Sequence, residues 1–180
     1  MRVIAGSARG VPLRSPKGRA TRPITDRVKE TLFAILGERV PGARVLDLYA
    51  GSGSIGIEAL SRGAASADFV EHGRAAVDAI RGNLSSSRTA DAGRVHPSDV
   101  EAYLRTTTDG PFDLVVLDPP YEVRAIVAPL QAVVPHLAPG AVVVVKHFWR
   151  TEVPDIDRLA AGRQRRFGET MLTFLELEDA

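Results

Sequence analysis

Residues 44–56 read RVLDLYAGSGSIG, an apolar strand pattern that runs directly into a glycine-rich turn. Gly51, Gly53 and Gly56 match the pattern G-x-G-x-x-G, and a helical pattern follows over residues 53–62. Glycines let the backbone turn tightly and approach a ligand, while the first turn of the helix offers free N–H groups. On this pattern alone the loop fits NAD, FAD or S-adenosylmethionine.

Two acidic residues sharpen the interpretation of this loop. Asp47 stands four residues before Gly51, where a dinucleotide site is usually apolar because a pyrophosphate lies close by. A carboxylate there would repel phosphate and suit an ammonium group; a helix cap or a structural hydrogen bond is the alternative. Glu71 ends the next strand, about 20 residues on, where an acid accepts bonds from ribose hydroxyls in NAD and S-adenosylmethionine binders alike. Because both acids accompany the glycines, we expect a ligand-binding loop.

A third acid, Asp99, follows the third predicted strand in the dipeptide Ser98-Asp99. Its carboxylate can accept a hydrogen bond from an adenine amino group, and it can equally cap the helix that we expect to begin at Val100. The two roles are compatible. Asp99 is therefore a candidate for the adenine end of the same ligand.

Strand and helix patterns alternate along the rest of the chain, which predicts a parallel sheet covered by helices on both faces. The predicted strands span residues 44–49, 67–71, 94–97, 112–118 and 141–148. The predicted helices that follow the first one span residues 74–84, 100–106 and 124–137, the last interrupted by Pro129 and Pro135. Residues 163–167 and 171–177 face each other across Gly168, so the sheet should end in an antiparallel hairpin.

The N-terminal segment differs in composition from the rest. Residues 2–14 predict two short strands around the turn from Gly6 to Gly10, and residues 15–23 form a loop rich in Pro, Gly and Arg. A helix should begin at Thr25 or Asp26, and Pro41 and Gly42 should end it. Residues 1–44 carry ten Lys/Arg against three Asp/Glu, whereas the remainder carries thirteen against nineteen. A basic arm on an acidic body suits a polyanion, although a solvated basic surface explains the charge equally well.

A second motif, Asp118-Pro119-Pro120-Tyr121, follows the apolar fourth strand. Ligands of open α/β sheets bind at the carboxyl ends of strands near the switch point, so this loop should face the glycine loop. The Asp118 carboxylate and the Pro119 carbonyl form two acceptors, as the exocyclic NH2 of a nucleobase requires. Tyr121 offers a face for stacking an unpaired or flipped base. The alternative is a structural Pro-Pro turn, which the glycine loop upstream makes less favourable.

Together these motifs resemble the class I S-adenosylmethionine-dependent methyltransferases, in particular those that methylate adenine N6 or guanine N2. RVIAGSARGVPLRSP (2–16), TRPITDRVKETLF (21–33) and DLYAGSG (47–53) are similar to the RsmD family, which methylates guanine N2 at one site in bacterial 16S ribosomal RNA. The resemblance covers nearly the whole chain. It departs at Ile24, where Thr is expected, and it leaves residues 85–93 without a match.

The resemblance implies a Rossmann-like class I methyltransferase domain over residues 41–180, with a mostly parallel seven-stranded sheet and an antiparallel C-terminal hairpin. Residues 1–40 would form a basic hairpin and helix that contact RNA. The implied cofactor is S-adenosyl-L-methionine, converted to S-adenosyl-L-homocysteine, with no metal. The substrate would be 16S rRNA in the assembled small ribosomal subunit, near ribosomal proteins.

The family's roles carry over residue by residue onto three groups. The cofactor-binding residues would be Asp47, Ala50, Gly51, Gly53, Glu71, His72 and Asp99. The catalytic residues would be Asp118, Pro119, Pro120 and Tyr121. The RNA-binding residues would be Arg2, Arg9, Arg14, Lys17, Arg19, Arg22, Arg27 and Lys29.

Composition excludes several other kinds of site. The chain has no Cys, so disulfides, thiolate zinc sites, iron–sulfur clusters and Cys nucleophiles are ruled out, and its four His residues lack metal-ligand spacing. No apolar run approaches the roughly 20 residues that a membrane helix needs, and the N-terminus lacks the apolar core of a signal peptide. We therefore expect a cytoplasmic, monomeric protein without membrane contact.

Three alternatives stay open at this point. An adenine-N6 methyltransferase acting on DNA or RNA would use the same Asp118 loop, because adenine also presents an NH2. An NAD-dependent oxidoreductase would use the same glycines but not that loop. An RNA-binding assembly factor without catalysis would need only the basic arm. Lys146 and His147, at the end of the fifth strand, are interpreted as ordinary polar strand ends, and the arginines at 163, 165 and 166 as a solvated strand face.

Overall fold

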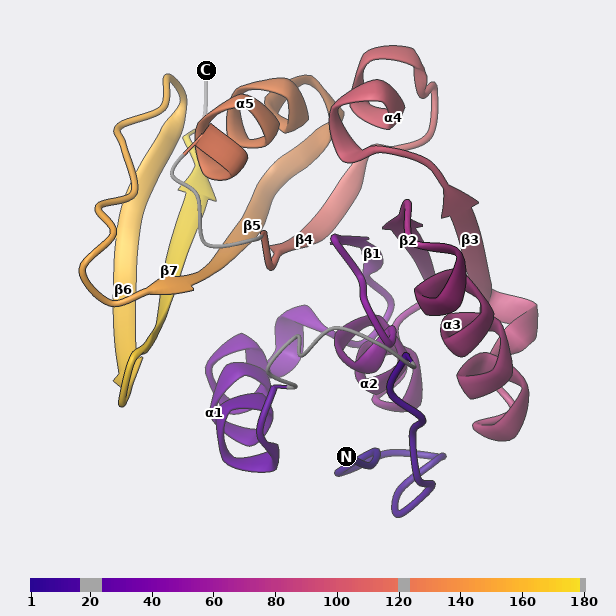
Figure 1. Cartoon of the computed structure of the whole chain (residues 1–180). Helices are drawn as coiled ribbons and strands as arrows, with labels where there is room; N and C mark the ends of the chain where they lie inside the picture. Colours follow the sequence, from indigo (N-terminus) through magenta and orange to yellow (C-terminus); the bar gives the residue numbers. More distant parts are fainter. Residues whose placement is uncertain (17–23, 120–123, 179–180) are drawn as a thin grey trace.

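The computed structural model describes residues 1–16, 24–119 and 124–178, and its centre is one seven-stranded sheet (Figure 1). The strand order is β3-β2-β1-β4-β5-β7-β6. Strands β1 to β5 are parallel, and β7 pairs antiparallel with both β5 and β6. The strands are β1 (Arg44–Leu48), β2 (Ser66–Glu71), β3 (Gly93–Pro97), β4 (Phe112–Leu117), β5 (Leu137–Phe148), β6 (Leu159–Phe167) and β7 (Thr170–Leu177). The mostly parallel sheet with an antiparallel C-terminal hairpin is thereby confirmed.

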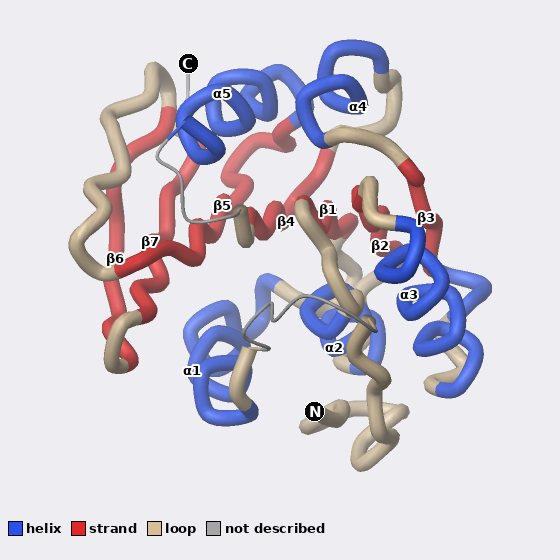
Figure 2. The backbone as a smooth tube through the Cα atoms, viewed as in Figure 1, coloured by secondary structure: helices blue, strands red, loops and turns tan. Residues whose placement is uncertain are grey.

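Helices cover both faces of the sheet, as Figure 2 shows. Helices α1 (Asp26–Leu36), α2 (Ser54–Ser61) and α3 (Arg74–Ser86) pack with one set of strand residues into a first apolar cluster. Helices α4 (Val100–Thr106) and α5 (Arg124–Val133) cover the opposite face and form a second cluster. Three short 3-10 turns complete the described chain: η1 (Gly37–Arg39), η2 (Ala90–Ala92) and η3 (Val134–His136). No described helix has the length and apolar character needed to cross a membrane.

Burial on both faces explains the continuous apolar runs of the central strands. All of Val142–Val145 in β5 are buried, although their side chains point alternately to the two faces. Fully burying one such side chain is worth about 1.5–3 kcal/mol, so strands of this kind stabilise the centre of the sheet. The alternation of helices and strands therefore follows from the need to cover two apolar faces.

The register brings three strand ends together at one edge. Leu48 at the end of β1 pairs with Val70 of β2 on one side and with Leu117 of β4 on the other. The strand order reverses at this point, because β2 and β3 lie on one side of β1 and β4 and β5 on the other. The segments that follow β1, β2 and β4 therefore meet at the switch point, where open α/β sheets bind ligands.

The N-terminal segment forms a hairpin that is shorter than the two strands that the sequence predicts. An antiparallel bridge joins Arg2 and Pro12, and the Val3 N–H donates to the Val11 carbonyl and the Leu13 N–H to the Met1 carbonyl, both at 3.0 Å. The amide N–H groups of Ile4 and Ala5 donate instead to the Glu58 carboxylate of α2. The pairing therefore ends early because a side chain distant in sequence satisfies these donors.

Other boundaries shift by smaller amounts. Helix α1 ends at Leu36, where Gly37 adopts a φ of 51° and its N–H donates to the Phe33 carbonyl, so Pro41 and Gly42 do not end it. Helix α5 continues through Pro129, which does not interrupt it. Strand β5 begins at Leu137, four residues earlier than predicted.

Candidate functional site

The glycine loop turns through backbone conformations that suit glycine. Gly51 and Gly53 have φ values of 57° and 73°, in the left-handed region that side chains rarely adopt. Gly53 is the N-cap of α2, and its N–H donates to the Ala50 carbonyl at 2.7 Å. Tyr49, which is not a glycine, also has a positive φ of 58°. The turn from β1 into α2 is thus a tight loop whose first two glycines are needed for its shape.

The third glycine of the motif has a different role. A Cβ atom added at Gly56 would lie 2.3 Å from Cε1 of Phe69. Phe69 belongs to β2 and is fully buried, so it has little room to move away. Gly56 therefore lets α2 pack closely against the sheet.

Asp47 forms the structural hydrogen bond that the sequence leaves open as an alternative. Its side chain is 1% exposed, and Oδ2 accepts a hydrogen bond from the Gly56 N–H at 3.0 Å. Burial raises the pKa of Asp47 to about 8, and the nearby negative charges of Asp118 and Glu71 act in the same direction. The carboxylate thus anchors the first turn of α2, and its contact with a ligand ammonium stays a prediction.

Glu71 holds the glycine loop from the neighbouring strand. Its Oε2 accepts from the Gly51 N–H at 3.0 Å, and its Oε1 accepts from the Gly73 N–H at 2.7 Å. Each carboxylate oxygen has a second lone pair, so hydroxyl groups could still donate to it. The His72 side chain is 76% exposed at the rim of this loop.

Asp99 caps the helix that follows the third strand. Its Oδ1 accepts from the Ala102 N–H at 3.0 Å, at the N-terminus of α4. The carboxylate is exposed, so it has room for a further donor. The capping role predicted from the sequence is confirmed, and the adenine contact stays a prediction.

Asp118 follows β4 and forms an ion pair that the sequence analysis did not anticipate. Lys146 Nζ lies 2.7 Å from Oδ1 and 2.8 Å from Oδ2 of Asp118. The Asp118 side chain is 30% exposed and that of Lys146 is 13% exposed, so the carboxylate has an open side. Burial raises the pKa of Asp118, and the Lys146 ammonium opposes this effect. Lys146 is thus part of the site and more than a polar strand end.

The Asp118 backbone ties this loop to β1, because its N–H donates to the Leu48 carbonyl at 3.3 Å. Pro119 is buried. Pro120 and Tyr121 lie outside the described residues, so their predicted roles are not tested by the geometry. The register of β4 and β5 places Lys146 beside Asp118, since Leu117 pairs with Val145. In the sequence, only the position of Lys146 directly after four buried valines could have indicated its ion pair with Asp118.

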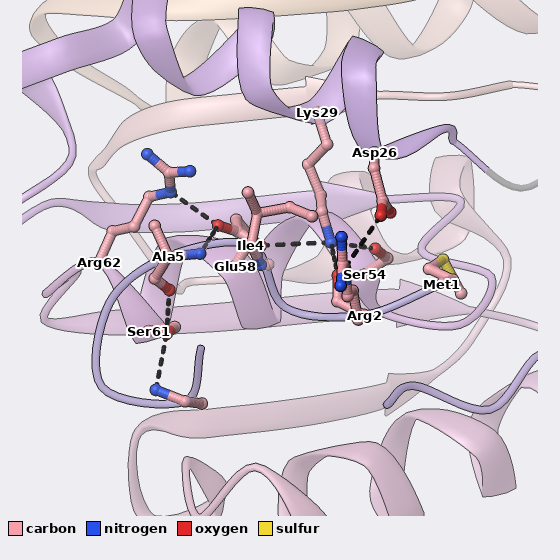
Figure 3. A network of polar contacts seen from close by, with 12 residues as sticks. Met1, Arg2, Ile4, Ala5, Asp26, Lys29, Ser54, Glu58, Ser61 and Arg62 are labelled. Atoms are coloured by element: carbon pink, nitrogen blue, oxygen red, sulfur yellow. Dashed lines mark hydrogen bonds and ion pairs between the residues drawn. The ribbon is translucent and has the colours of Figure 1, made fainter. Parts of the chain in front are cut away.

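A buried polar network fastens the N-terminal segment to α2 (Figure 3). Glu58 Oε2 and Oε1 accept from the N–H groups of Ile4 at 2.8 Å and Ala5 at 3.0 Å. Arg62 Nε donates to the same carboxylate at 2.8 Å. Ser61 Oγ accepts from the Ala8 N–H at 2.9 Å. The segment is therefore held rigidly beside the helix that follows the glycine loop.

The prediction that Lys29 contacts RNA was wrong. Its side chain is 0% exposed, and its Nζ lies 3.2 Å from Oε2 of Glu58, which is also 0% exposed. Nζ also donates to Ser54 Oγ at 3.1 Å. Burial lowers the pKa of Lys29, and the Glu58 carboxylate opposes this effect. A lone acid within the otherwise uncharged helix SIGIEALS was the signal that a buried cation would be needed.

The other described arginines that were predicted to bind RNA are exposed. Arg2 lies 3.2 Å from the Asp26 carboxylate, and Arg9, Arg14 and Arg27 are also exposed. The arm reaches the glycine loop through Asn83, whose Nδ2 donates to the carbonyls of Arg14 and Ser52, both at 2.9 Å. The predicted contacts of these four arginines with RNA stay predictions. Lys17, Arg19 and Arg22 lie outside the described residues.

One cluster of possible metal ligands lies away from this edge. Oxygen and nitrogen atoms of Asp68, His96 and Asp109 all lie within 4.8 Å of one another. His96 Nε2 and Asp68 Oδ1 are already hydrogen-bonded at 2.7 Å, and the Tyr103 hydroxyl donates to Asp109 at 3.3 Å. The three side chains are therefore interpreted as a structural hydrogen-bond network between β2, β3 and α4.

The comparisons with known proteins agree with this geometry. The model of the family described as Conserved hypothetical protein 95 matches residues 1–176. The chain belongs to this family, which is the RsmD family. YlbH of Bacillus subtilis is 35% identical over 175 residues, which cover 94% of this chain and 95% of YlbH. The resemblance stated from the sequence is thereby confirmed.

A further relative is the Escherichia coli protein named "Ribosomal RNA small subunit methyltransferase D". It is 40% identical over 121 residues, which cover 67% of this chain and 60% of that protein. Among solved structures, the E. coli protein yhhF superposes with a TM-score of 0.88 at 32% identity, covering 99% of this chain and 98% of that one. A protein from Thermus thermophilus gives a TM-score of 0.84 at 30% identity, covering 98% and 99%. The Rossmann-like class I methyltransferase fold is therefore shown.

Proposed function

We propose that this chain is an S-adenosylmethionine-dependent methyltransferase that methylates the exocyclic N2 amine of one guanine, of the guanine 966 type, in 16S rRNA. The observation that carries the proposal is the open, ion-paired carboxylate of Asp118 at the switch point, beside the glycine loop. The name of the E. coli relative supports small-subunit rRNA as the substrate class.

The charge of the site favours a cationic cofactor over a dinucleotide. Glu71 and Asp118 lie close enough to Asp47 that their negative charges help to raise its pKa to about 8, so these two carboxylates supply the negative charge near the glycine loop at neutral pH. A pyrophosphate would meet these carboxylates with repulsion, whereas a sulfonium and an ammonium would be attracted. When bound, S-adenosylmethionine supplies a methyl group on such a sulfonium. Gly51 and Gly53 would let the backbone approach it, Glu71 would accept from its ribose and Asp99 from its adenine.

Asp118 and Pro119 perform the central step in this proposal. The carboxylate and the Pro119 carbonyl accept the two hydrogens of the guanine amine, which holds the nitrogen and favours release of its lone pair from the ring. As the N–CH3 bond forms, the S–CH3 bond would break with its electron pair staying on sulfur, and positive charge develops on the nitrogen, which the Asp118 carboxylate stabilises. The methylated amine then becomes neutral by losing one of its two hydrogens as a proton to solvent. Each carboxylate oxygen has two lone pairs, so Asp118 can accept from the amine while Lys146 still donates to it.

Lys146 orients the catalytic carboxylate and favours its ionised form. Its two contacts, at 2.7 and 2.8 Å, hold both oxygens of Asp118. Because burial raises the pKa of Asp118, an adjacent ammonium keeps more of it charged at neutral pH. Lys146 is therefore a positioning residue in this proposal.

The RNA must present the guanine unpaired or flipped out of its helix, because a paired base cannot enter such a pocket. Tyr121 would stack on the base, a contact worth about 1–3 kcal/mol. Arg2, Arg9, Arg14 and Arg27, together with Lys17, Arg19 and Arg22, would bind phosphates. With such a substrate the enzyme would act in the cytoplasm, as a monomer and without a metal.

The test is transfer of labelled methyl from S-adenosylmethionine to three acceptors: small ribosomal subunits from cells lacking this enzyme, naked 16S rRNA, and DNA. We expect transfer to the subunits and none to DNA. Transfer to DNA alone would favour the adenine-N6 alternative. Binding of NAD in place of S-adenosylmethionine would favour the oxidoreductase, and RNA binding without any transfer would favour the assembly factor.

A further inference from the structure

The C-terminal hairpin carries cationic side chains around the single tryptophan of the chain, outside the site described above. Cζ of Arg166 lies 3.7 Å from the centroid of the Trp149 ring, and Cζ of Arg150 lies 4.8 Å from it. Arg165 and Arg166 are exposed on β6, and Arg150 is exposed directly after β5. We call Trp149, Arg150, Arg165 and Arg166 the hairpin cluster.

The arginines of the hairpin cluster keep hydrogen-bond donors available. Arg166 Nε donates to the Gly168 carbonyl at 2.8 Å, and Arg165 Nη1 donates to the Gln164 carbonyl at 2.9 Å. A guanidinium has five N–H donors, so each of these bonds leaves several donors for a ligand. Two like charges on one indole ring repel each other, and an anion bound between them would relieve that repulsion.

The hairpin cluster lies at the same edge of the sheet as Asp118. Strand β5 runs parallel to β4 and ends at Phe148, and the Trp149 N–H donates to the Glu169 carbonyl in the turn of the hairpin. Residues at this end of β5, β7 and β6 therefore extend the edge that carries the Asp118 loop. In Figure 1 the hairpin stands at the left of the sheet, on the opposite side from β3.

The register gives the spacing within this edge. Lys146 pairs with Leu172, and Leu172 pairs with Arg165, so the three residues form one row across β5, β7 and β6 with their side chains on one face. Arg166 lies in the next row with Met171 and His147, so its side chain faces the other side, where it stacks on Trp149. Neighbouring strands lie about 4.8 Å apart, which places the Arg165 backbone roughly 10 Å from that of Lys146. Lys146 itself contacts Asp118. An RNA strand with its target base at Asp118 would carry neighbouring phosphates along this row to Arg165, and over the strand ends to Trp149, Arg150 and Arg166.

Phosphate is the anion that this chemistry fits best. Arginine presents a planar fork that bonds phosphate oxygens in pairs, and stacking on the indole pre-orients the fork. The N-terminal arm lies against α2 and α3, on the other flank of the site. A strand held by both flanks would be fixed on either side of the target nucleotide. A purely structural explanation exists, since charged residues on an edge strand also prevent sheet-to-sheet aggregation.

We infer that the hairpin cluster binds the phosphate backbone of the substrate RNA close to the methylated nucleotide, as a second RNA contact opposite the N-terminal arm. The inference rests on the proposed RNA substrate and adds a surface that the N-terminal basic residues do not include. It assigns Trp149 the task of orienting two guanidinium groups.

The test compares the double variant Arg150→Gln/Arg166→Gln with the matched control Arg81→Gln/Arg105→Gln, whose exposed arginines lie on α3 and α4. Dissociation constants for unmethylated small subunits are measured over a series of salt concentrations. Each lost phosphate contact reduces the magnitude of the slope of log K against log salt concentration by about 0.7–0.9. We therefore expect this magnitude to fall by about 1.4–1.8 in the test variant, which loses two contacts, and to stay unchanged in the control. Arg150→Lys/Arg166→Lys should fall between the wild type and the Gln variant.

Trp149 supplies a second readout, because it is the only tryptophan of the chain. We expect its fluorescence to change when an RNA fragment containing the target site binds the wild type. Equal slopes for the test and control variants, or an unchanged fluorescence at saturating RNA, would overturn the inference and leave the structural explanation. Methyl transfer by the wild type is measured on the same subunits. Binding without transfer would contradict the proposed function, while the slopes would still report on the cluster.

Discussion

The carboxylates near the glycine loop and the carboxylate of Asp118 have different kinds of hydrogen-bond partner. Asp47 and Glu71 accept hydrogen bonds from backbone N–H groups, whose positions are set by the loop itself. Asp118 is held instead by Lys146, a flexible side chain. A carboxylate bound by backbone is part of the scaffold, whereas one bound by a side chain can share or exchange its partner as substrate arrives. The proposed cofactor half is therefore held by backbone contacts, whereas the proposed target-base half depends on one ion pair between side chains.

The largest effect is expected at the proposed target-base half. Asp118→Asn should lower kcat by about 10²–10³, because it removes the negative charge that stabilises the developing cation. S-adenosylmethionine should still bind, as measured by calorimetry, with an affinity reduced far less than kcat, because Glu71 and the glycine loop are unchanged. Asp113→Asn is the control, since Asp113 is an exposed acid on the same strand. Near-normal turnover in Asp118→Asn would exclude it as the stabilising group.

Lys146→Met should change the pH dependence of the reaction. Asp118 acts when ionised, so activity is present above its pKa and is lost as the pH falls through it. Burial raises that pKa and the ammonium opposes the rise, so removing the ammonium should move the acidic limb of kcat/KM to higher pH. Lys146→Arg retains the charge and should keep the limb in place. Superimposable profiles for the wild type and Lys146→Met would show that Lys146 does not act through Asp118.

Substitutions at two glycines of the same motif should have different effects: Gly56→Ala should lower stability alone, whereas Gly51→Ala should also weaken cofactor binding. Gly56→Ala places a methyl group against Phe69 and should lower the free energy of unfolding by about 1–3 kcal/mol, as overpacking does. Gly51→Ala meets nothing closer than 3.9 Å but adopts a φ of 57°, at a strain of roughly 1–2 kcal/mol. We expect only the Gly51 variant to weaken cofactor affinity in addition. Urea titrations with calorimetry decide this, and equal losses of affinity in both variants would contradict the division of roles.

The remaining prediction concerns Asp47, and its effect appears in stability rather than in rate. Its pKa is about 8 in the folded protein, against an ordinary value of 3.8. The folded state therefore binds more protons than the unfolded state between these values, so this residue lowers stability as the pH rises through that range. Asp47→Asn should gain stability relative to the wild type between pH 5 and pH 8 in urea titrations. A difference that does not vary with pH would indicate that Asp47 is ionised throughout.

Local patterns predicted most of the fold. The alternation of apolar strands with helices and the final hairpin around Gly168 are properties of short segments, and the structure has each of them. The N-terminal hairpin is shorter than predicted because Glu58 takes the amide donors of Ile4 and Ala5 across more than fifty residues of sequence. No local pattern contains that contact.

The site was predictable to the same extent. The glycine loop and Asp118 were found because each follows an apolar strand within one motif. Lys146 was missed because its partner depends on the register of β4 and β5, and Lys29 was misplaced because its partner lies on another helix. Charged residues whose partners come from other elements cannot be assigned from their own segment.

The most direct test of the central claim is the identity of the methylated nucleoside. Small subunits lacking the modification are incubated with the enzyme and deuterated S-adenosylmethionine, then digested to nucleosides for mass spectrometry. The account predicts that the label appears in N2-methylguanosine from a single position of 16S rRNA. Label in N6-methyladenosine, or in no nucleoside of the subunit, would contradict it.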